Sequence, residues 1–434
     1  MGKTAAFKKT CKMLVIINIG FLLLLLCCHC MDKFAANSGL HSVFYDVSFF
    51  SESDRFADFF NPIQYSMDRN LLNDSDTDSP PFLHLCSWIV SVFIQLFFPG
   101  KLQNHFGGGN DFGQSIYGTT LWMIILIAYM IAFSKGIKKL FINKENHPKQ
   151  KHMYYMFAVI GVLGAYPFLW AMDRANFVLF VALLILYAMT ELDTNPQKAA
   201  VLIGLAAALK LYPAIYGLLF LKKRDWKSAI ICAFTGIGVT LFALLVFSSN
   251  MQGVGFMETL SDWVHKMTSY TVTGNGQSAE LIVWNNSFMT LGYFLINVLL
   301  GVQNIETVSR LLNICKVFVF LVFVLAVIGC FFLKKRHDII LILSVLIVAF
   351  PTYSSMYNLL LLSVPFLYWI SKEEDNVIPI IAVLLLTNKA IVIYYVESMD
   401  INVTLNSLLN PMLLFFTIVY IYYKRIKLHK AIEE

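Results

Sequence analysis

Residues 13–30 read MLVIINIGFLLLLLCCHC, an apolar stretch of 18 residues without Lys, Arg, Asp or Glu. A run of this length can cross a hydrocarbon layer of about 30 Å as a helix. Inside lipid only helices and closed barrels satisfy the backbone, and continuous rather than alternating apolar residues favour helices. The stretch therefore predicts a membrane-spanning helix. Because its end lacks a small-residue cleavage site, we expect an uncleaved anchor.

The rest of the chain repeats this pattern. Of its 434 residues 58% are hydrophobic and only 14% are charged, which excludes an ordinary soluble domain. We expect an all-α fold, a polytopic transmembrane helical bundle of about 10 to 13 spans, in a single integral domain covering residues 1–434. After the first span, the expected spans are 116–133, 153–171, 177–191, 228–248, 312–333, 339–350, 357–370, 377–395 and 408–423.

The charged residues indicate which side of the membrane each loop faces. Residues 31–81 hold nine carboxylates against three basic residues, whereas Lys and Arg gather in the short connectors. Basic connectors face the cytoplasm, so we expect cytoplasmic N- and C-termini. Residues 31–81 then form a first outer loop and residues 249–310 a second. The apolar helix at 82–98 is expected to lie at the outer interface, because a crossing there would export a basic cluster. A second interfacial helix is expected at 288–300 in the second outer loop.

Residues 198–221 break this simple pattern. A single crossing would carry the basic cluster at 222–227 outward, whereas two half-helices that meet at Lys210-Leu211-Tyr212-Pro213 keep it inside. Pro213 supports the break because proline removes a helix hydrogen bond. Broken helices within a membrane are tolerated where they line a cavity, so this junction is a candidate site.

Ionisable residues at the predicted outer boundary are candidates for chemistry, because charges at membrane depth are costly. Asp58 lies among aromatic residues in the first outer loop, with Asp46 and Asp54 as secondary candidates. The other candidates are Asp173, Arg174 and Asn176 between two apolar runs, Lys210 and Tyr212 at the half-helix junction, and Tyr357 in the turn 351–357. Each has a structural alternative: a solvated loop carboxylate, a turn with an ion pair, a snorkelling lysine or a polar turn.

One carboxylate and two cations on the outer face suit group transfer from a lipid-linked phosphate. A carboxylate can serve as general base on an acceptor hydroxyl, while Arg or Lys stabilises the departing phosphate. We expect no metal, because Cys27, Cys28, His29 and Cys30 are adjacent and cannot all turn inward from one helix. No cofactor is expected either, since Gly107 to Gly109 do not form a nucleotide-binding fingerprint.

Several stretches resemble glycosyltransferase family 87, which belongs to the polytopic GT-C class. Residues 166–177, YPFLWAMDRANF, are similar to its "PF–(E/D)RGN" stretch, and residues 204–213, GLAAALKLYP, match its "GLAAALKLYP" stretch. Asp58 to Asn61 resemble its first-loop "DF" element and Ser79 to Phe82 its "YPPL". Weaker similarity extends to residues 285–287 and 351–357. This chain departs at Ala175, where the family usually has Gly, at Ser79 for Tyr, and at Tyr357, where a His often follows.

The resemblance implies an integral membrane hexosyltransferase that uses a polyprenyl-phosphate sugar, often mannose. The transfer would be inverting, with Asp58 as catalytic base, and the acceptor would be a glycan or a glycolipid on the outer face of the bilayer. It favours the bacterial plasma membrane over the endoplasmic reticulum. Two alternatives stay open: a lipid-linked glycan polymerase or ligase, which usually has Arg-rich outer loops, and a transporter or flippase, which usually shows an inverted repeat. No nucleic acid partner is expected, since the net charge of +6 comes from Lys and Arg beside spans.

Overall fold

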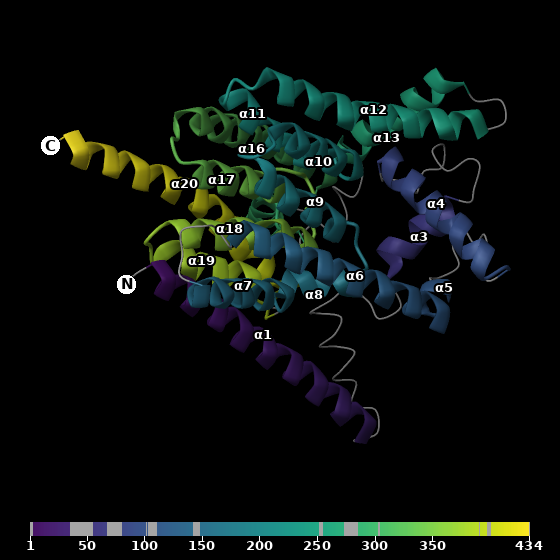
Figure 1. Cartoon of the computed structure of the whole chain (residues 1–434), viewed down its shortest axis with the longest axis horizontal. Coiled ribbons are helices and arrows are strands. Elements are labelled where there is room, and N and C mark those ends of the chain that lie inside the picture. Colours follow the sequence, from purple (N-terminus) through teal and green to yellow (C-terminus); the bar gives the residue numbers. More distant parts are fainter. Residues whose placement is uncertain are drawn as a thin grey trace. The chain divides into compact units, whose positions relative to one another are not determined.

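A computed structural model describes residues 3–34, 55–66, 80–100, 102, 111–141, 148–250, 255–272, 285–302, 304–389, 391–396 and 401–433. The chain divides into two compact units, and Figure 1 labels their helices. Unit 1 comprises residues 1–49, 144–169 and 275–434, and unit 2 comprises residues 50–143 and 170–274. The expected single domain therefore stays a prediction, and each unit is described by itself.

Unit 2 contains the main candidate residues, Asp58, Asp173, Arg174, Asn176, Lys210 and Tyr212. Its helices are α3 (Ala57–Tyr65), α4 (Pro81–Phe97), α5 (Asp111–Gln114), α6 (Ile116–Phe141), α9 (Val178–Glu191), α10 (Pro196–Leu209), the 3-10 helix η2 (Tyr212–Gly217), α11 (Leu218–Lys222), α12 (Trp226–Asn250) and α13 (Phe256–Val272). The boundary between the units falls within α8 (Tyr166–Asp173).

Unit 1 contains the first helix and most of the C-terminal half. Its elements are α1 (Lys3–Phe34), α7 (Pro148–Leu163), α15 (Phe288–Phe294), the π-helical turn η3 (Leu295–Leu299), α16 (Ile305–Phe332), α17 (Arg336–Ala349), η4 (Met356–Leu359), α18 (Leu360–Lys372), α19 (Val377–Leu386), β1 (Val392–Val396), β2 (Ile401–Thr404) and α20 (Leu405–Glu433).

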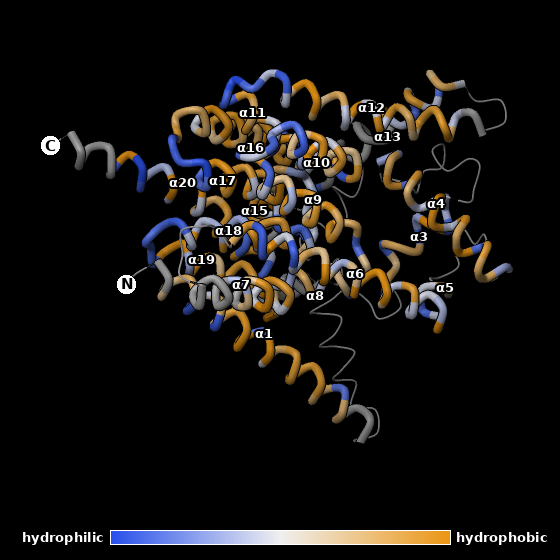
Figure 2. Tube along the Cα trace, viewed as in Figure 1, coloured by the Kyte–Doolittle hydropathy of each residue, from blue (hydrophilic) through white to orange (hydrophobic). Residues whose placement is uncertain are grey.

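The helical membrane class is confirmed. Within the described residues five helices are long and apolar enough to cross a membrane: 5–31, 116–141, 226–248, 306–332 and 405–427. Four shorter apolar helices accompany them, α4, α9, α10 and α19. The apolar colour runs along most of α1 in Figure 2. Exposed Ile, Leu and Phe side chains on these long helices are the surface that lipid would cover.

Two expected helices differ from the prediction. Residues 153–171 form two helices rather than one, because α7 ends at Leu163 and α8 begins at Tyr166. The helix expected over 377–395 ends at Leu386, and residues 392–396 form strand β1, which pairs antiparallel with β2. Valine, isoleucine and tyrosine dominate this strand, and such residues favour extended backbone. An apolar run alone could not distinguish the two conformations.

Helices α10 and α12 of unit 2 pack backbone against backbone, and they lie side by side in Figure 1. A Cβ on Gly204 of α10 would approach the carbonyl oxygen of Cys232 to 2.7 Å, so only glycine fits there. Small residues at the contact of membrane helices allow this close approach. At the other end of α10, Asn195 caps the helix by accepting a hydrogen bond from the backbone N–H of Lys198 at 3.0 Å. The close contact at Gly204 and the cap at Asn195 together fix the position of α10, and therefore the position of Lys210 directly after it.

Candidate functional site

In unit 2 the carboxylate of Asp58 contacts two residues that are distant from it in the sequence. Arg174 donates from Nη2 and Nε to Asp58 Oδ1 at 2.5 and 3.2 Å. Asn176 donates from Nδ2 to Asp58 Oδ2 at 2.6 Å. The side chains of Asp58 and Arg174 are 19% and 14% exposed, so the pair lies at the edge of the protein interior. We call Asp58, Arg174 and Asn176, with Asp173, Arg55 and Lys210, the Asp58 cluster.

The backbone holds these side chains together. Phe56 N–H donates to Asp173 O at 2.8 Å, and Asp58 N–H donates to Arg174 O at 3.1 Å. Phe56 and Ala175, which flank this pairing, have left-handed backbones with φ of 63° and 52°. Non-glycine residues adopt this conformation only at a cost, and such strain gathers at functional sites. The local chain is thus bent to place Asp58 next to Arg174.

Aromatic packing supports the same loop. The ring centroid of Phe59 lies 5.3 Å from Trp122 and 5.4 Å from Phe177, and Phe56 lies 6.3 Å from Trp122. Phe59 and Trp122 are buried. The aromatic residues around Asp58 therefore anchor the start of α3 onto α6 and the start of α9.

The carboxylate of Asp58 keeps room for one more donor. A carboxylate offers about four lone-pair positions. Among the described residues, two donors from Arg174 use Oδ1 and one donor from Asn176 uses Oδ2. Asn176 is itself fixed, because its Oδ1 accepts the backbone N–H of Val178 at 2.8 Å. The open position on Oδ2 is where a hydroxyl could donate.

Lys210 lies at the predicted helix break, and the break itself is confirmed. Helix α10 ends at Leu209, Lys210 is extended with φ −149° and ψ 124°, and η2 begins at Tyr212 with Pro213 in its first turn. The Lys210 Nζ lies 5.8 Å from the ring centroid of Tyr212. Lys210 also interacts electrostatically with Asp58. The structure therefore joins the third cation to the Asp58 cluster.

A second pair of charges completes this cluster. Arg55 Nε lies 3.6 Å from Asp173 Oδ1, with the two side chains 39% and 13% exposed. Sequence reasoning singled out Asp173 but gave Arg55 no role. The signal was present, because Arg55 stands three residues before Asp58 in a loop with few basic residues.

Of the three remaining candidates, one lies within the described residues. Asp46 and Asp54 lie outside the described residues. Tyr357 belongs to η4 of unit 1. There the two weakly family-like stretches pair: Asn285 Oδ1 accepts Ser354 N–H at 2.8 Å, and Asn286 N–H donates to Ser354 O at 2.8 Å. Asn285 and Asn286 are buried, so these amides join two segments of unit 1.

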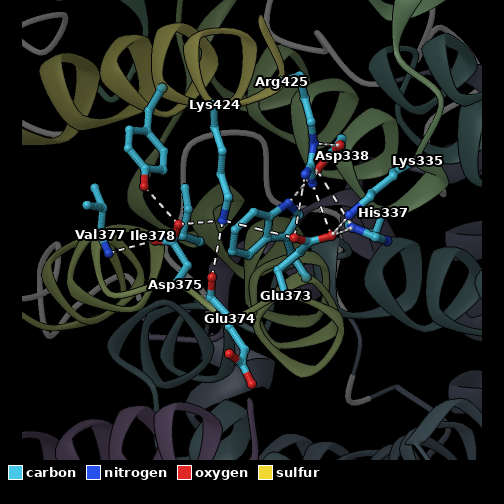
Figure 3. A network of polar contacts seen from close by, with 12 residues as sticks. Lys335, His337, Asp338, Glu373, Glu374, Asp375, Val377, Ile378, Lys424 and Arg425 are labelled. Carbon is cyan, nitrogen blue, oxygen red and sulfur yellow. Dashed lines mark hydrogen bonds and ion pairs between the residues drawn. The ribbon is translucent and has the colours of Figure 1, made fainter. Parts of the chain in front are cut away.

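A larger charged cluster in unit 1 escaped sequence reasoning. It joins the start of α17, the α18–α19 connector and α20, and Figure 3 shows its side chains converging. The buried Asp338 accepts from Arg425 Nε and Nη2 at 2.6 and 2.8 Å and from Trp369 Nε1 at 2.7 Å. We call the following residues the Asp338 cluster: Lys335, His337, Asp338, Glu373, Asp375, Lys424 and Arg425.

The other carboxylates of the Asp338 cluster are equally well bonded. Glu373 Oε1 lies 2.6 Å from Lys335 Nζ, 2.9 Å from His337 Nε2 and 3.1 Å from Arg425 Nη2. Asp375 accepts from Lys424 and Tyr420 at 2.6 and 2.8 Å. It also accepts two backbone N–H groups at the start of α19. This cluster leaves little capacity for a ligand, which indicates a structural role.

No group of three or more His, Cys, Asp or Glu residues in the described part of the chain could hold a metal ion. The Asp58 cluster itself places a carboxylate with an open acceptor position near a second carboxylate and three cations. Such a set suits proton removal from a hydroxyl next to a phosphate.

The long apolar helices and the partly exposed Asp58 cluster are those of an integral membrane protein with a candidate active site. The chain is a member of glycosyltransferase family 87, whose family model matches residues 114–363. The match includes Arg174, Asn176 and Lys210, whereas Asp58 and Arg55 precede it. Comparison with curated proteins and with solved structures found no match. The family makes the chain a membrane glycosyltransferase that acts on a sugar donor and an acceptor.

Proposed function

We propose that this glycosyltransferase moves a hexose, with mannose favoured, from a polyprenyl-phosphate donor to a glycan or glycolipid acceptor. The transfer takes place on the outer face of a bacterial plasma membrane, and both termini are cytoplasmic. The observation that carries the proposal is the Asp58 carboxylate, which keeps one open acceptor position on Oδ2 beside a lysine at a broken helix.

In this mechanism the acceptor hydroxyl donates its hydrogen bond to Asp58 Oδ2. Its oxygen attacks the anomeric carbon from the face opposite the phosphate, so the configuration inverts. As the new carbon–oxygen bond forms, the bond from the anomeric carbon to the phosphate oxygen breaks and its electron pair stays on the phosphate. The hydroxyl proton passes to Asp58. Lys210 stabilises the charge on the leaving phosphate.

The remaining residues orient this chemistry. Arg174 and Asn176 hold the carboxylate so that the open lone pair keeps one direction, and accurate placement of reacting groups contributes much of an enzymatic rate. Tyr212 lies beside Lys210 and limits where its ammonium can lie. Asp173 fixes the loop through its backbone carbonyl, which accepts the Phe56 N–H. Arg174 therefore acts chiefly on Asp58, and Lys210 on the phosphate.

The experiment measures transfer of labelled mannose from polyprenyl-phosphate mannose to endogenous membrane acceptors, with glucose and galactose donors in parallel. We expect Asp58→Asn to lower the transfer rate by about 10²- to 10⁴-fold, the usual contribution of a general base. Asp193→Asn is the matched control, because Asp193 is an exposed carboxylate of the same unit and pairs with Lys223. Undiminished transfer by a folded Asp58→Asn protein would refute the proposed base.

A further inference from the structure

Two arginines of the Asp58 cluster are held very differently. Arg174 makes two hydrogen bonds to Asp58, the shorter at 2.5 Å, and is 14% exposed. Arg55 has a looser ion pair, 3.6 Å from Nε to Asp173 Oδ1, and is 39% exposed. The exposed side of the Arg55 guanidinium is open to an anion that approaches from solvent, whereas Arg174 is mostly buried. Arg55 is therefore the arginine that a ligand can recruit.

The charges of the cluster favour a phosphate at this point. Arg55, Arg174 and Lys210 face the two carboxylates of Asp58 and Asp173, which leaves these five side chains with a net charge of +1. A polyprenyl-phosphate sugar carries one negative charge on its phosphodiester. The sum is neutral before transfer. After transfer Asp58 holds a proton and the phosphate is a dianion, so the sum is neutral again.

Arg55 is needed for this balance. Without Arg55 the charges of the four remaining side chains sum to zero, and the incoming phosphate brings an uncompensated negative charge. The charge of Arg174 is already balanced by Asp58, to which it donates two hydrogen bonds. Guanidinium groups bind phosphate through two parallel hydrogen bonds, which a lysine cannot do.

We infer that Arg55 is a phosphate-binding residue, which leaves Asp173 and binds the phosphate of the polyprenyl donor together with Lys210. This inference rests on the proposed function for the identity of the donor. It assigns to a residue outside the family match a part of the donor site. Asp173 then acts as the counter-ion that holds Arg55 while no phosphate is bound.

The test uses sugar-free polyprenyl phosphate as the probe, with its binding to the full-length protein in detergent measured directly and as inhibition of transfer. We expect Arg55→Ala to weaken binding by about tenfold or more, since a charged hydrogen bond is lost. Arg55→Lys should recover part of the loss. Asp173→Asn should tighten binding severalfold, because Arg55 no longer has to leave a carboxylate.

The role of Arg55 is tested by opposite changes in polyprenyl-phosphate binding, weaker in Arg55→Ala and tighter in Asp173→Asn. If the Arg55–Asp173 pair only stabilises the loop, both variants weaken binding together, and the inference is overturned. Arg310→Ala is the matched control, because Arg310 forms an exposed pair with Glu306 and should leave binding unchanged. Thermal unfolding of each variant checks that it is folded, and Arg55→Gln replaces any variant that is not.

Failure of this inference can be told from failure of the proposed function. Wild-type protein that binds polyprenyl phosphate through Arg55 but transfers no hexose would overturn the function and keep the phosphate site. Wild-type protein that transfers hexose, with unchanged donor KM and product binding in Arg55→Ala, would keep the function and overturn the role of Arg55.

Discussion

The Asp58 cluster of unit 2 and the Asp338 cluster of unit 1 use the same kinds of residues with opposite results. In unit 1 Asp338 is completely buried, and its oxygens accept three donors from Arg425 and Trp369. In unit 2 Asp58 also accepts three donors, but its side chain is partly exposed, so a ligand can reach its remaining lone-pair position. The backbone around Asp58 is also strained at Phe56 and Ala175. A completely buried carboxylate on relaxed backbone indicates a structural role, whereas a partly exposed carboxylate on strained backbone indicates a site.

The largest effect on stability should come from breaking the buried pair of unit 1. Arg425→Ala leaves the carboxylate of Asp338 buried without its cation, and such a loss costs about 3–5 kcal/mol in the free energy of unfolding. Equilibrium unfolding in detergent measures it. The double variant Asp338→Leu/Arg425→Met should be much more stable than Arg425→Ala, because no unpaired charge remains.

The exposed pair of Arg310 and Glu306 provides the control for that experiment. Arg310→Ala should not change stability measurably, since exposed ion pairs contribute little. A protein in which Arg425→Ala unfolds like wild type would remove the contrast between the two clusters.

The sequence predicted much of this contrast in unit 2 and none of it in unit 1. Apolar run length gave the long helices, and Pro213 located the break after α10. The cost of charge near lipid singled out Asp58, Arg174 and Lys210. The residues of the Asp338 cluster instead lie in connectors and near a helix end, among them Lys335, Glu373 and Arg425. Basic residues at such positions are expected from the orientation of the spans in the membrane, so they did not indicate a cluster.

The contacts that could not be predicted join residues far apart in the sequence. Asp338 and Arg425 are 87 residues apart, and nothing in either local stretch indicates the other. The same applies to Arg55 and Asp173, whose pairing depends on two backbone hydrogen bonds between distant segments. The apolar residues 392–396 were assigned to a helix because run length cannot identify a strand that pairs with β2.

Acid should weaken the Asp338 cluster. Burial works to raise the pKa of Glu373, but hydrogen bonds from His337, Lys335 and Arg425 hold that pKa well below its usual range. The pKa of Asp375 is also lowered, because hydrogen bonds from Lys424, Ile378 N–H and Tyr420 outweigh burial. A carboxylate whose folded pKa is depressed contributes stability above its unfolded pKa, about 4, and loses it as pH falls through the folded value.

Thermal unfolding between pH 7 and pH 3 measures this loss. The wild-type midpoint should fall steadily below about pH 5, whereas Glu373→Gln should start lower and fall less. Glu306→Gln, which removes an exposed carboxylate, should follow the wild-type curve. Parallel curves for wild type and Glu373→Gln would show that Glu373 contributes no acid sensitivity.

The smallest effect tests the strain at the Asp58 cluster. Ala175 is buried with a left-handed backbone, at a position where the family usually has glycine. Ala175→Gly relieves about 1–2 kcal/mol of backbone strain and loses about 0.8 kcal/mol of methyl burial, so stability should stay within about 1 kcal/mol of wild type. Ala188→Gly is the matched control, because Ala188 is buried in the regular helix α9. There the same change loses both methyl burial and helix propensity, about 2 kcal/mol together.

The same variant also tests what positions Asp58, because Ala175 directly follows Arg174. If the backbone bend positions Asp58, the transfer rate of Ala175→Gly should equal that of wild type; if the methyl group does, the rate should fall. Equal destabilisation by the two substitutions would mean that the bend at Ala175 stores no strain.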